Sequence, residues 1–154
     1  MKLLVCVDLS PETPILIKYA QQFAQQLSAR MCLLHVTDSQ EEMVGYGGVF
    51  GELPVYIDPK EIRHDIAQRF QREHQQMQTL SQQLQDAGLS AIGLLVNGTS
   101  VVTTILKEAD KLAADMIIVG SHHKSLLVQL IEGSTSKSLI NQANRPVLVV
   151  PVNV

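Results

Sequence analysis

Five short, continuous apolar runs, separated by longer stretches, most limit the folds open to this chain. They occupy residues 3–7, 31–36, 91–96, 116–119 and 147–150. Apolar runs of this length are typical of strands that are buried on both faces, as in parallel sheets. A stretch with helical periodicity lies between each run and the next. This alternation predicts an α/β, doubly wound, five-stranded parallel sheet with right-handed crossovers and helices on both faces.

Capping residues predict where two of the helices begin and end. Thr13 followed by Pro14 predicts an N-cap and a first helical position after the first strand. Asp58 with Glu61 three residues later forms a capping-box pattern, and Gly88 is typical of a helix end. Together these signals predict one helix after the first strand and a much longer one before the third.

The predicted long helix has an apolar stripe on one face and many Gln and Arg residues on the other, which indicates one buried and one solvated side. The stripe consists of Ile62, Ile66, Phe70, Met77, Leu80 and Leu84. His64 and His74 lie outside it, and we expect both to face solvent. Thr99 or Ser100 is expected to cap a third helix, and a fourth is expected from Gly133 onward.

Residues 37–57 break the alternation with a long loop rich in glycine. The residues in it that disfavour regular secondary structure are Gly45, Gly47, Gly48, Gly51 and Pro54. Loops of this length inside compact domains are usually functional or mobile. We expect this one to close over a ligand or a partner through Tyr46, Phe50 or Tyr56, with a disordered insertion as the alternative.

The composition is that of a globular protein with a core of its own. Hydrophobic residues make up 45% and charged residues 18% of a chain whose 154 residues fit a single domain, 1–154. Cys6 and Cys32 lie in apolar runs, and we expect buried, reduced thiols there.

Charge and hydropathy narrow the range of partners. The net charge of −3 argues against nucleic acid, whose binding requires clustered Lys and Arg. No apolar run reaches the roughly 20 residues of a membrane helix, so no membrane partner is expected. The run at 3–7 is too short for a signal peptide, and we expect the protein to be cytoplasmic.

An anion-binding site is predicted where the fourth apolar run ends and the last helix begins. The run leads into Gly120, and further along Gly133 precedes Ser134, Thr135 and Ser136. Glycine allows close approach to the backbone. A helix N-terminus presents unpaired N–H groups and the positive end of its dipole, and hydroxyls add donors. An ordinary loop with a serine-rich cap is the alternative.

Other chemistry has less support in the sequence. His122 and His123 are adjacent, so they do not share a helix face as a metal pair would, and we expect no metal there. His35 is interpreted as a strand-end histidine. Lys137 follows Gly133 at the wrong spacing for a GxxxxGK[ST] loop. No nucleophile with a paired base is evident, so an enzyme is not expected, with a slow ATPase as the alternative.

Motifs spread along nearly the whole chain, outside residues 37–57, carry a resemblance. They are Val7-Asp8-Leu9-Ser10, Leu33-Leu34-His35-Val36, Ile118-Val119-Gly120-Ser121, Gly133-Ser134-Thr135-Ser136 and Arg145-Pro146-Val147-Leu148-Val149-Val150. Taken together they resemble the universal stress protein family. The resemblance implies a Rossmann-like sheet of order 3-2-1-4-5, a homodimer that pairs through the last strand and, in one branch of the family, bound ATP.

The resemblance also implies where a ligand would bind. Ligands of open α/β sheets bind beyond the strand C-termini, where the strand order reverses. By resemblance, Asp8 and the backbone of Val36 hold adenosine. The phosphates meet Gly120, the backbone of His122 and His123, Gly133, Ser134, Thr135 and Ser136. The expected cofactor is an adenine nucleotide (ATP, ADP or AMP), with or without Mg²⁺.

One position departs from the nucleotide-binding pattern. That pattern is glycine, two residues, glycine, nine residues, glycine and then Ser or Thr. The spacing from Gly120 to Gly133 is kept, but His123 replaces the middle glycine. The retained glycines favour a stress or signalling protein that holds nucleotide as a regulator. His123 favours the rival, a nucleotide-free dimeric adaptor with an unknown protein partner. If nucleotide binds, AMP or ADP is predicted to bind at least as well as ATP.

Overall fold

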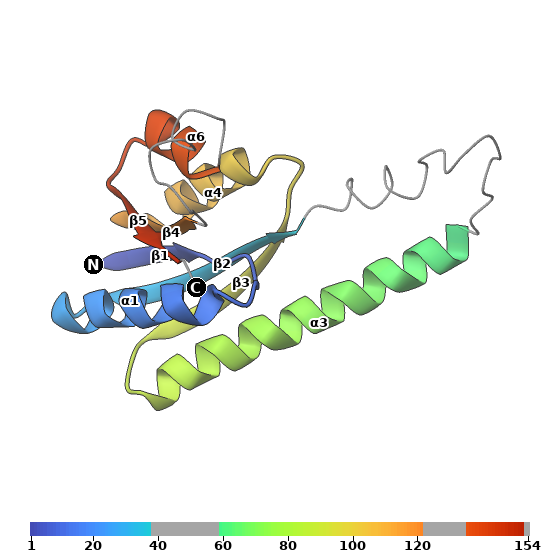
Figure 1. Cartoon of the computed structure of the whole chain (residues 1–154), viewed down its shortest axis with the longest axis horizontal. Helices are drawn as coiled ribbons and strands as arrows, with labels where there is room; N and C mark the ends of the chain where they lie inside the picture. The colour runs from blue at the N-terminus through green and yellow to red at the C-terminus, as the bar shows by residue number, and fades with distance from the viewer. Residues whose placement is uncertain (38–58, 122–134, 153–154) are drawn as a thin grey trace.

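Five parallel strands form one sheet at the centre of the molecule (Figure 1). The computed structural model describes residues 1–37, 59–121 and 135–152. The strands are β1 (Lys2–Cys6), β2 (Arg30–Thr37), β3 (Ala91–Asn97), β4 (Met116–Ser121) and β5 (Val147–Pro151). All neighbouring pairs are parallel, and their order is β3-β2-β1-β4-β5. The predicted doubly wound fold and its strand order are therefore confirmed.

Helices cover both faces of this sheet (Figure 1). Those in the described residues are α1 (Thr13–Gln26), α3 (Pro59–Asp86), α4 (Val101–Lys111) and α6 (Thr135–Gln142). α1 and α3 pack on one face, and α4 and α6 pack on the other. Within the described ranges no helix combines the length and the apolar character needed to cross a membrane.

The core lies in two layers, one on each face of the sheet, because successive strand residues point to opposite sides. In β1, Leu3 and Val5 pack in the layer under α1 and α3, whereas Leu4 packs in the layer under α4 and α6. None of these three side chains has exposed surface. β1 is therefore the most central strand, and its C-terminal end has a fixed position between the two helical layers.

The start of α1 differs from the sequence prediction. Its N-cap is Glu12, which makes no side-chain capping bond, and Thr13 is the first helical residue. The Thr13 hydroxyl instead donates to Oδ1 of Asp8 at 3.2 Å, which is why it does not cap the helix. Leu27, at the C-cap of this helix, is 42% exposed.

Other helix ends agree with the prediction. The Ser100 side chain caps α4 by accepting from the N–H of Thr103 at 3.4 Å. α3 ends before Gly88, whose φ of +84° is the left-handed geometry that glycine favours. His64 and His74 are both exposed, as expected. The predicted cap Asp58 and the predicted loop at 37–57, apart from Thr37 at the end of β2, lie outside the described residues.

α3 is much longer than the strand that it covers. Its 28 residues span about 42 Å at 1.5 Å per residue, whereas the seven residues of β3 span about 23 Å. Figure 1 shows its N-terminal half extending beyond the sheet. α3 comes close to the sheet at Gly93, where an added Cβ would lie 2.9 Å from the carbonyl oxygen of Met77.

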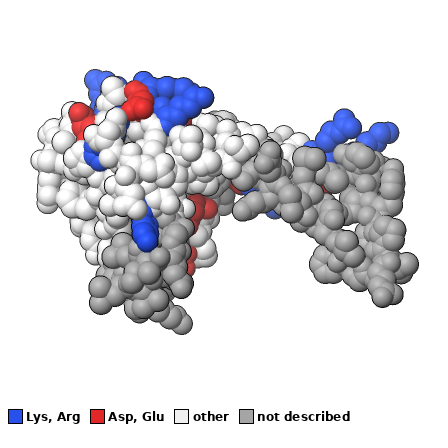
Figure 2. Space-filling model, turned by 90° about the horizontal axis from the view of Figure 1, so that it is seen from above, with Lys and Arg blue, Asp and Glu red and all other residues white. Residues whose placement is uncertain are grey.

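The charged side chains on the face seen in Figure 2 are dispersed. Lys and Arg form separate groups over the body and at the far end of α3, with uncharged surface between them. Acidic side chains lie close to the group over the body.

Candidate functional site

A crevice of about 280 Å³ opens beyond the C-terminal ends of β1 and β4, where the strand order reverses. Its apolar lining includes Val7, Leu16, Leu34, Val36, Ile105 and Val119. Its polar lining includes Asp8, Ser10, Glu12, Thr13, His35, Thr135 and Ser136. This is the position at which open α/β sheets bind their ligands.

The crevice brings together five of the nine predicted site residues. These are Asp8, Val36, Gly120, Thr135 and Ser136. The other four, His122, His123, Gly133 and Ser134, fall outside the described residues. Residues that are far apart in the sequence therefore meet at one place, because parallel strands deliver their carboxyl ends to one edge of the sheet.

Asp8 lies at the rim of the crevice in a tightly turned loop. Its Oδ1 accepts the N–H of Ser10 at 3.1 Å and the hydroxyl of Thr13 at 3.2 Å. Leu9, between them, has a φ of 58°, an uncommon left-handed conformation for a residue other than glycine. These contacts orient the Asp8 carboxylate, which is exposed and lines the crevice.

Gly120 ends β4 on the opposite side of the crevice. An added Cβ there would lie 3.4 Å from both methyl carbons of Val152, so glycine leaves room for this side chain. The Ser136 hydroxyl donates to the carbonyl oxygen of Gly120 at 3.3 Å. This bond ties the first turn of α6 to the end of β4, and Thr135 and Ser136 line the crevice.

His35 has more contacts than a strand-end histidine would require. It is 8% exposed, lines the crevice, and its Nδ1 lies 2.8 Å from the carbonyl oxygen of Val7. Its Nε2 lies 3.6 Å from Oε1 of Glu73 on α3. Arg69, which was expected to face solvent, pairs with Glu73 at 2.8 Å and donates to Thr37 Oγ1 at 3.0 Å.

The sequence did contain a signal for this cluster. The predicted apolar stripe of α3 skips one position between Phe70 and Met77, and Glu73 occupies that position. A carboxylate within a buried stripe requires a polar partner. Arg69 on the same helix supplies it at 2.8 Å, and His35 of β2 lies 3.6 Å from the same oxygen.

Cys6 lines the crevice, and burial raises the pKa of its thiol to about 12. Burial also raises the pKa of Cys32, while the charge of Lys2 lowers it in part. Both cysteines are free, and their raised pKa values keep them as uncharged thiols near neutral pH. Across the described ranges, no three His, Cys, Asp or Glu side chains gather as a metal ion would require.

The fold and the crevice define a class of protein. This is a doubly wound α/β protein with a ligand-sized crevice at the switch point of its sheet. The model of the universal stress protein family matches residues 1–151, and the chain belongs to that family.

Relatives from archaea and bacteria cover almost the whole chain. Universal stress protein MJ0577 of Methanocaldococcus jannaschii is 28% identical over 152 residues, which cover 97% of this chain and 93% of that protein. Universal stress protein A of Escherichia coli strain K12 is 26% identical over 152 residues, with the same two coverages.

Solved structures have the same fold. The structure of MJ0577 has a TM-score of 0.74 at 27% identity and covers 97% of this chain and 94% of that one. A universal stress protein of Archaeoglobus fulgidus in complex with dAMP has a TM-score of 0.62 at 19% identity, with coverages of 97% and 96%. A universal stress protein in complex with cAMP has a TM-score of 0.65 at 17% identity, with coverages of 99% and 97%.

Proposed function

We propose that this protein binds an adenine nucleotide (ATP, ADP or AMP) in the crevice between β1 and β4. One observation carries the proposal. A single crevice combines apolar walls, an oriented carboxylate at Asp8 and the N-terminal turn of α6 with the hydroxyls of Thr135 and Ser136. These groups match the three parts of a nucleotide.

Each part of the nucleotide has its own position in this proposal. The base packs on the apolar wall that includes Leu34, and the backbone of Val36 reads its edge. The Asp8 carboxylate accepts hydrogen bonds from the ribose hydroxyls. The phosphates lie at the α6 N-terminus, where N–H groups and the helix dipole favour anions. A Mg²⁺ ion would be held mainly by the phosphates, because Mg²⁺ prefers oxygen ligands.

Relatives support this assignment at the level of the family. Universal stress proteins of the same fold have been solved with dAMP and with cAMP, both adenine nucleotides. This chain has a crevice where the strand order of its sheet reverses.

We further propose that the nucleotide acts as a regulatory ligand in a stress or signalling role and is not turned over quickly. The Cys6 thiol in the crevice is held in its uncharged form, so it is a poor nucleophile. Two free thiols fit a reducing compartment such as the cytoplasm.

Titration calorimetry with AMP, ADP and ATP, each with and without Mg²⁺, tests this function. The wild type is expected to bind at least one of them, and Asp8→Ala should weaken binding about tenfold or more. Asp86→Ala is the matched control, because Asp86 is an exposed carboxylate at the end of α3. Binding that is equal in Asp8→Ala and Asp86→Ala would contradict the assigned crevice.

A second candidate function is a nucleotide-free dimeric adaptor. It is favoured by His123, which stands where the nucleotide-binding branch has glycine. If none of the three nucleotides binds the wild type but His123→Gly binds one, the adaptor is the better assignment.

A further inference from the structure

A polar relay, which we define as His35, Glu73 and Arg69, joins α3 to the ends of β1 and β2. At one end, His35 Nδ1 lies 2.8 Å from the carbonyl oxygen of Val7. In the middle, Glu73 Oε1 lies 3.6 Å from His35 Nε2 and 2.8 Å from Arg69 Nε. At the other end, Arg69 Nη2 donates to Thr37 Oγ1 at 3.0 Å.

The chemistry of the Val7 contact determines which nitrogen of His35 carries hydrogen. A carbonyl oxygen only accepts hydrogen bonds, so Nδ1 must be the donor. Nε2 therefore points to Glu73, and the contact is an ion pair when His35 carries its second proton. Arg69 supplies a permanent positive charge on the other side of the same carboxylate.

The relay ends next to the two residues that the proposed nucleotide site uses for adenosine. Val7, which accepts from His35, immediately precedes Asp8. Thr37, which accepts from Arg69, immediately follows Val36. The adenosine end of the crevice is thus bordered by two strand ends. Arg69 of α3 bonds directly to the end of β2, whereas the segment after β1 bonds to His35, which lies beside Glu73 of α3.

Glu73 lies where an apolar side chain would be the simpler choice. The adjoining positions of the α3 stripe, Phe70 and Met77, are apolar, and Met77 is 2% exposed. The Glu73 Oε2 atom is buried and has no hydrogen-bond partner within the part of the chain that the structure describes. Burial of a carboxylate costs free energy unless it is paired. The Glu73 carboxylate, fixed by its bond to Arg69, is well suited to hold His35 in one orientation.

We propose that His35 is a positioning residue for the adenosine end of the crevice, held in place by Glu73 and Arg69 and acting on Asp8 through the carbonyl of Val7. The proposal rests on the adenine-nucleotide site proposed above. His35 fixes the direction of the Val7 carbonyl and, with it, the start of the loop that carries Asp8.

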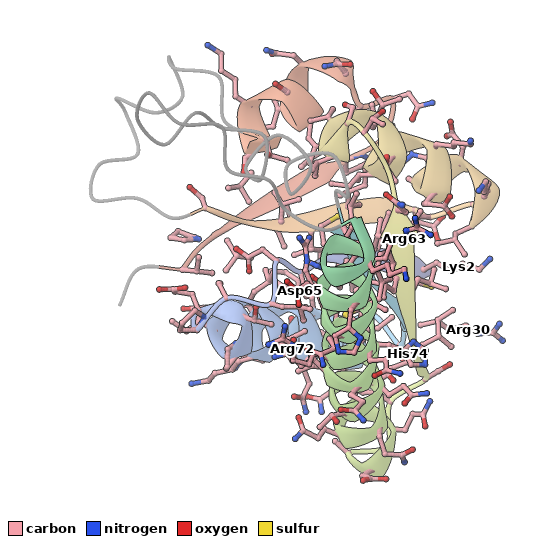
Figure 3. All side chains as sticks on the ribbon, turned by 90° about the vertical axis from the view of Figure 1, so that its right-hand side faces the viewer. Lys2, Arg30, Arg63, Asp65, Arg72 and His74 are labelled. Carbon is pink, nitrogen blue, oxygen red and sulfur yellow. The ribbon has the colours of Figure 1, made fainter. Side chains whose placement is uncertain are left out.

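Two substitutions of His35 distinguish a role as hydrogen-bond donor to Val7 from a role that only fills space in the core. His35→Leu fills the space but has no donor, whereas the amide nitrogen of His35→Asn can replace Nδ1 as a donor to Val7. His74→Leu and His74→Asn are the matched controls, because His74 is exposed on the same helix as Glu73 and is labelled in Figure 3.

Calorimetric titration of each variant with AMP and with adenosine gives the decisive comparison. His35→Leu should weaken both ligands about tenfold, His35→Asn should stay within about threefold of the wild type, and both His74 variants should bind like it. The proposal is overturned if His35→Leu binds like the wild type, or if His35→Asn loses as much affinity as His35→Leu.

A measurement on the wild type covers the case in which His35→Leu does not fold. Ring ¹⁵N NMR should show a protonated Nδ1 on His35, and adding AMP should shift the His35 signals while those of His74 stay in place. A His35 ring that does not respond to bound AMP overturns the relay and leaves the proposed function standing. A wild type that binds neither AMP, ADP nor ATP overturns the proposed function, and the positioning role falls with it.

Discussion

The hydroxyl of Thr13 lies 3.2 Å from Oδ1 of Asp8 and joins the first turn of α1 to the rim of the crevice. The same oxygen accepts the N–H of Ser10 at 3.1 Å. Thr13 is 5% exposed, so its side chain has little freedom to turn away. The first turn of α1 therefore helps to fix the direction of the carboxylate that is proposed to bind ribose.

Replacing Thr13 with Val should weaken binding of AMP, because the isosteric side chain has no hydroxyl to orient Asp8. We expect a loss of about three- to tenfold, the effect of one hydrogen bond. Thr13→Ser keeps the donor and should bind as the wild type does. Calorimetry measures the AMP affinity of the wild type and the two variants. Equal affinities would mean that the Thr13 hydroxyl does not contribute to binding.

The choice between ATP and AMP should depend on His123, which lies outside the described residues. An unperturbed histidine has a pKa of about 6.5, so it gains positive charge as the pH falls through that value. Affinity for ATP should therefore rise from pH 7.5 to pH 5.5, more than affinity for AMP. His123→Gly should raise ATP affinity at pH 7.5 and flatten this dependence. A glycine variant with an unchanged preference would place His123 away from the phosphates.

Stability at alkaline pH should reflect the thiol of Cys6, which is half-buried and has a raised pKa. Its pKa is about 12 in the folded protein, against 9.0 for the unperturbed thiol. From pH 9 to pH 12 the unfolded chain loses this proton while the folded chain keeps it, so the free energy of unfolding falls as the pH rises. Urea denaturation at pH 8 and pH 10.5 should show a smaller decline in Cys6→Ala than in the wild type. Equal declines would mean that the thiol is not shielded.

Arg145 should contribute strongly to stability although it is remote from the crevice. Its Nη1 donates to the carbonyl oxygens of Ala109 at 2.7 Å and Ala114 at 2.8 Å, and its Nη2 pairs with Asp110. Arg145→Met leaves carbonyls at the end of α4 without these donors, which should cost about 2 kcal/mol of unfolding free energy.

Chemical denaturation measures the loss, and Arg30→Met is the control. The Arg30 side chain is exposed at the start of β2 and is labelled in Figure 3. Its replacement should change stability by less than about 0.5 kcal/mol. Similar effects of the two substitutions would argue against capping of α4 by Arg145.

A homodimer through β5 is predicted, because β5 is an edge strand of the sheet. The N–H of Val152 donates to Ser121 on β4 at 3.1 Å, so the alternate position 151 would direct its N–H away from β4, and proline is tolerated there. The N–H of Val149 shares this outward direction. Val149→Pro removes an edge donor, and sedimentation velocity should then show monomers. A dimer of unchanged strength would place the interface elsewhere.

The fold was predictable because strand burial and helix periodicity are local signals. The stripe at Met77, Leu80 and Leu84 identifies the buried face of α3 without knowledge of its neighbours. The role of Glu73 was not predictable in this way, since its partner His35 lies on β2, distant in the sequence. Local rules also assigned Thr13 to the α1 cap, and the tertiary contact with Asp8 overrode them.

The close contact between Gly93 and Met77 has a mechanical consequence. The α3 backbone lies close to β3 there, because Gly93 has no side chain between the two elements. About 27 Å of helix separates Met77 from Pro59, at 1.5 Å per residue, but only about 6 Å separates it from Glu73. A tilt of α3 about this point would move Glu73 roughly four to five times less than the helix end. Glu73 and Pro59 lie on the same side of Met77, so such a tilt would displace the start of α3 far more than the contact between Glu73 and His35.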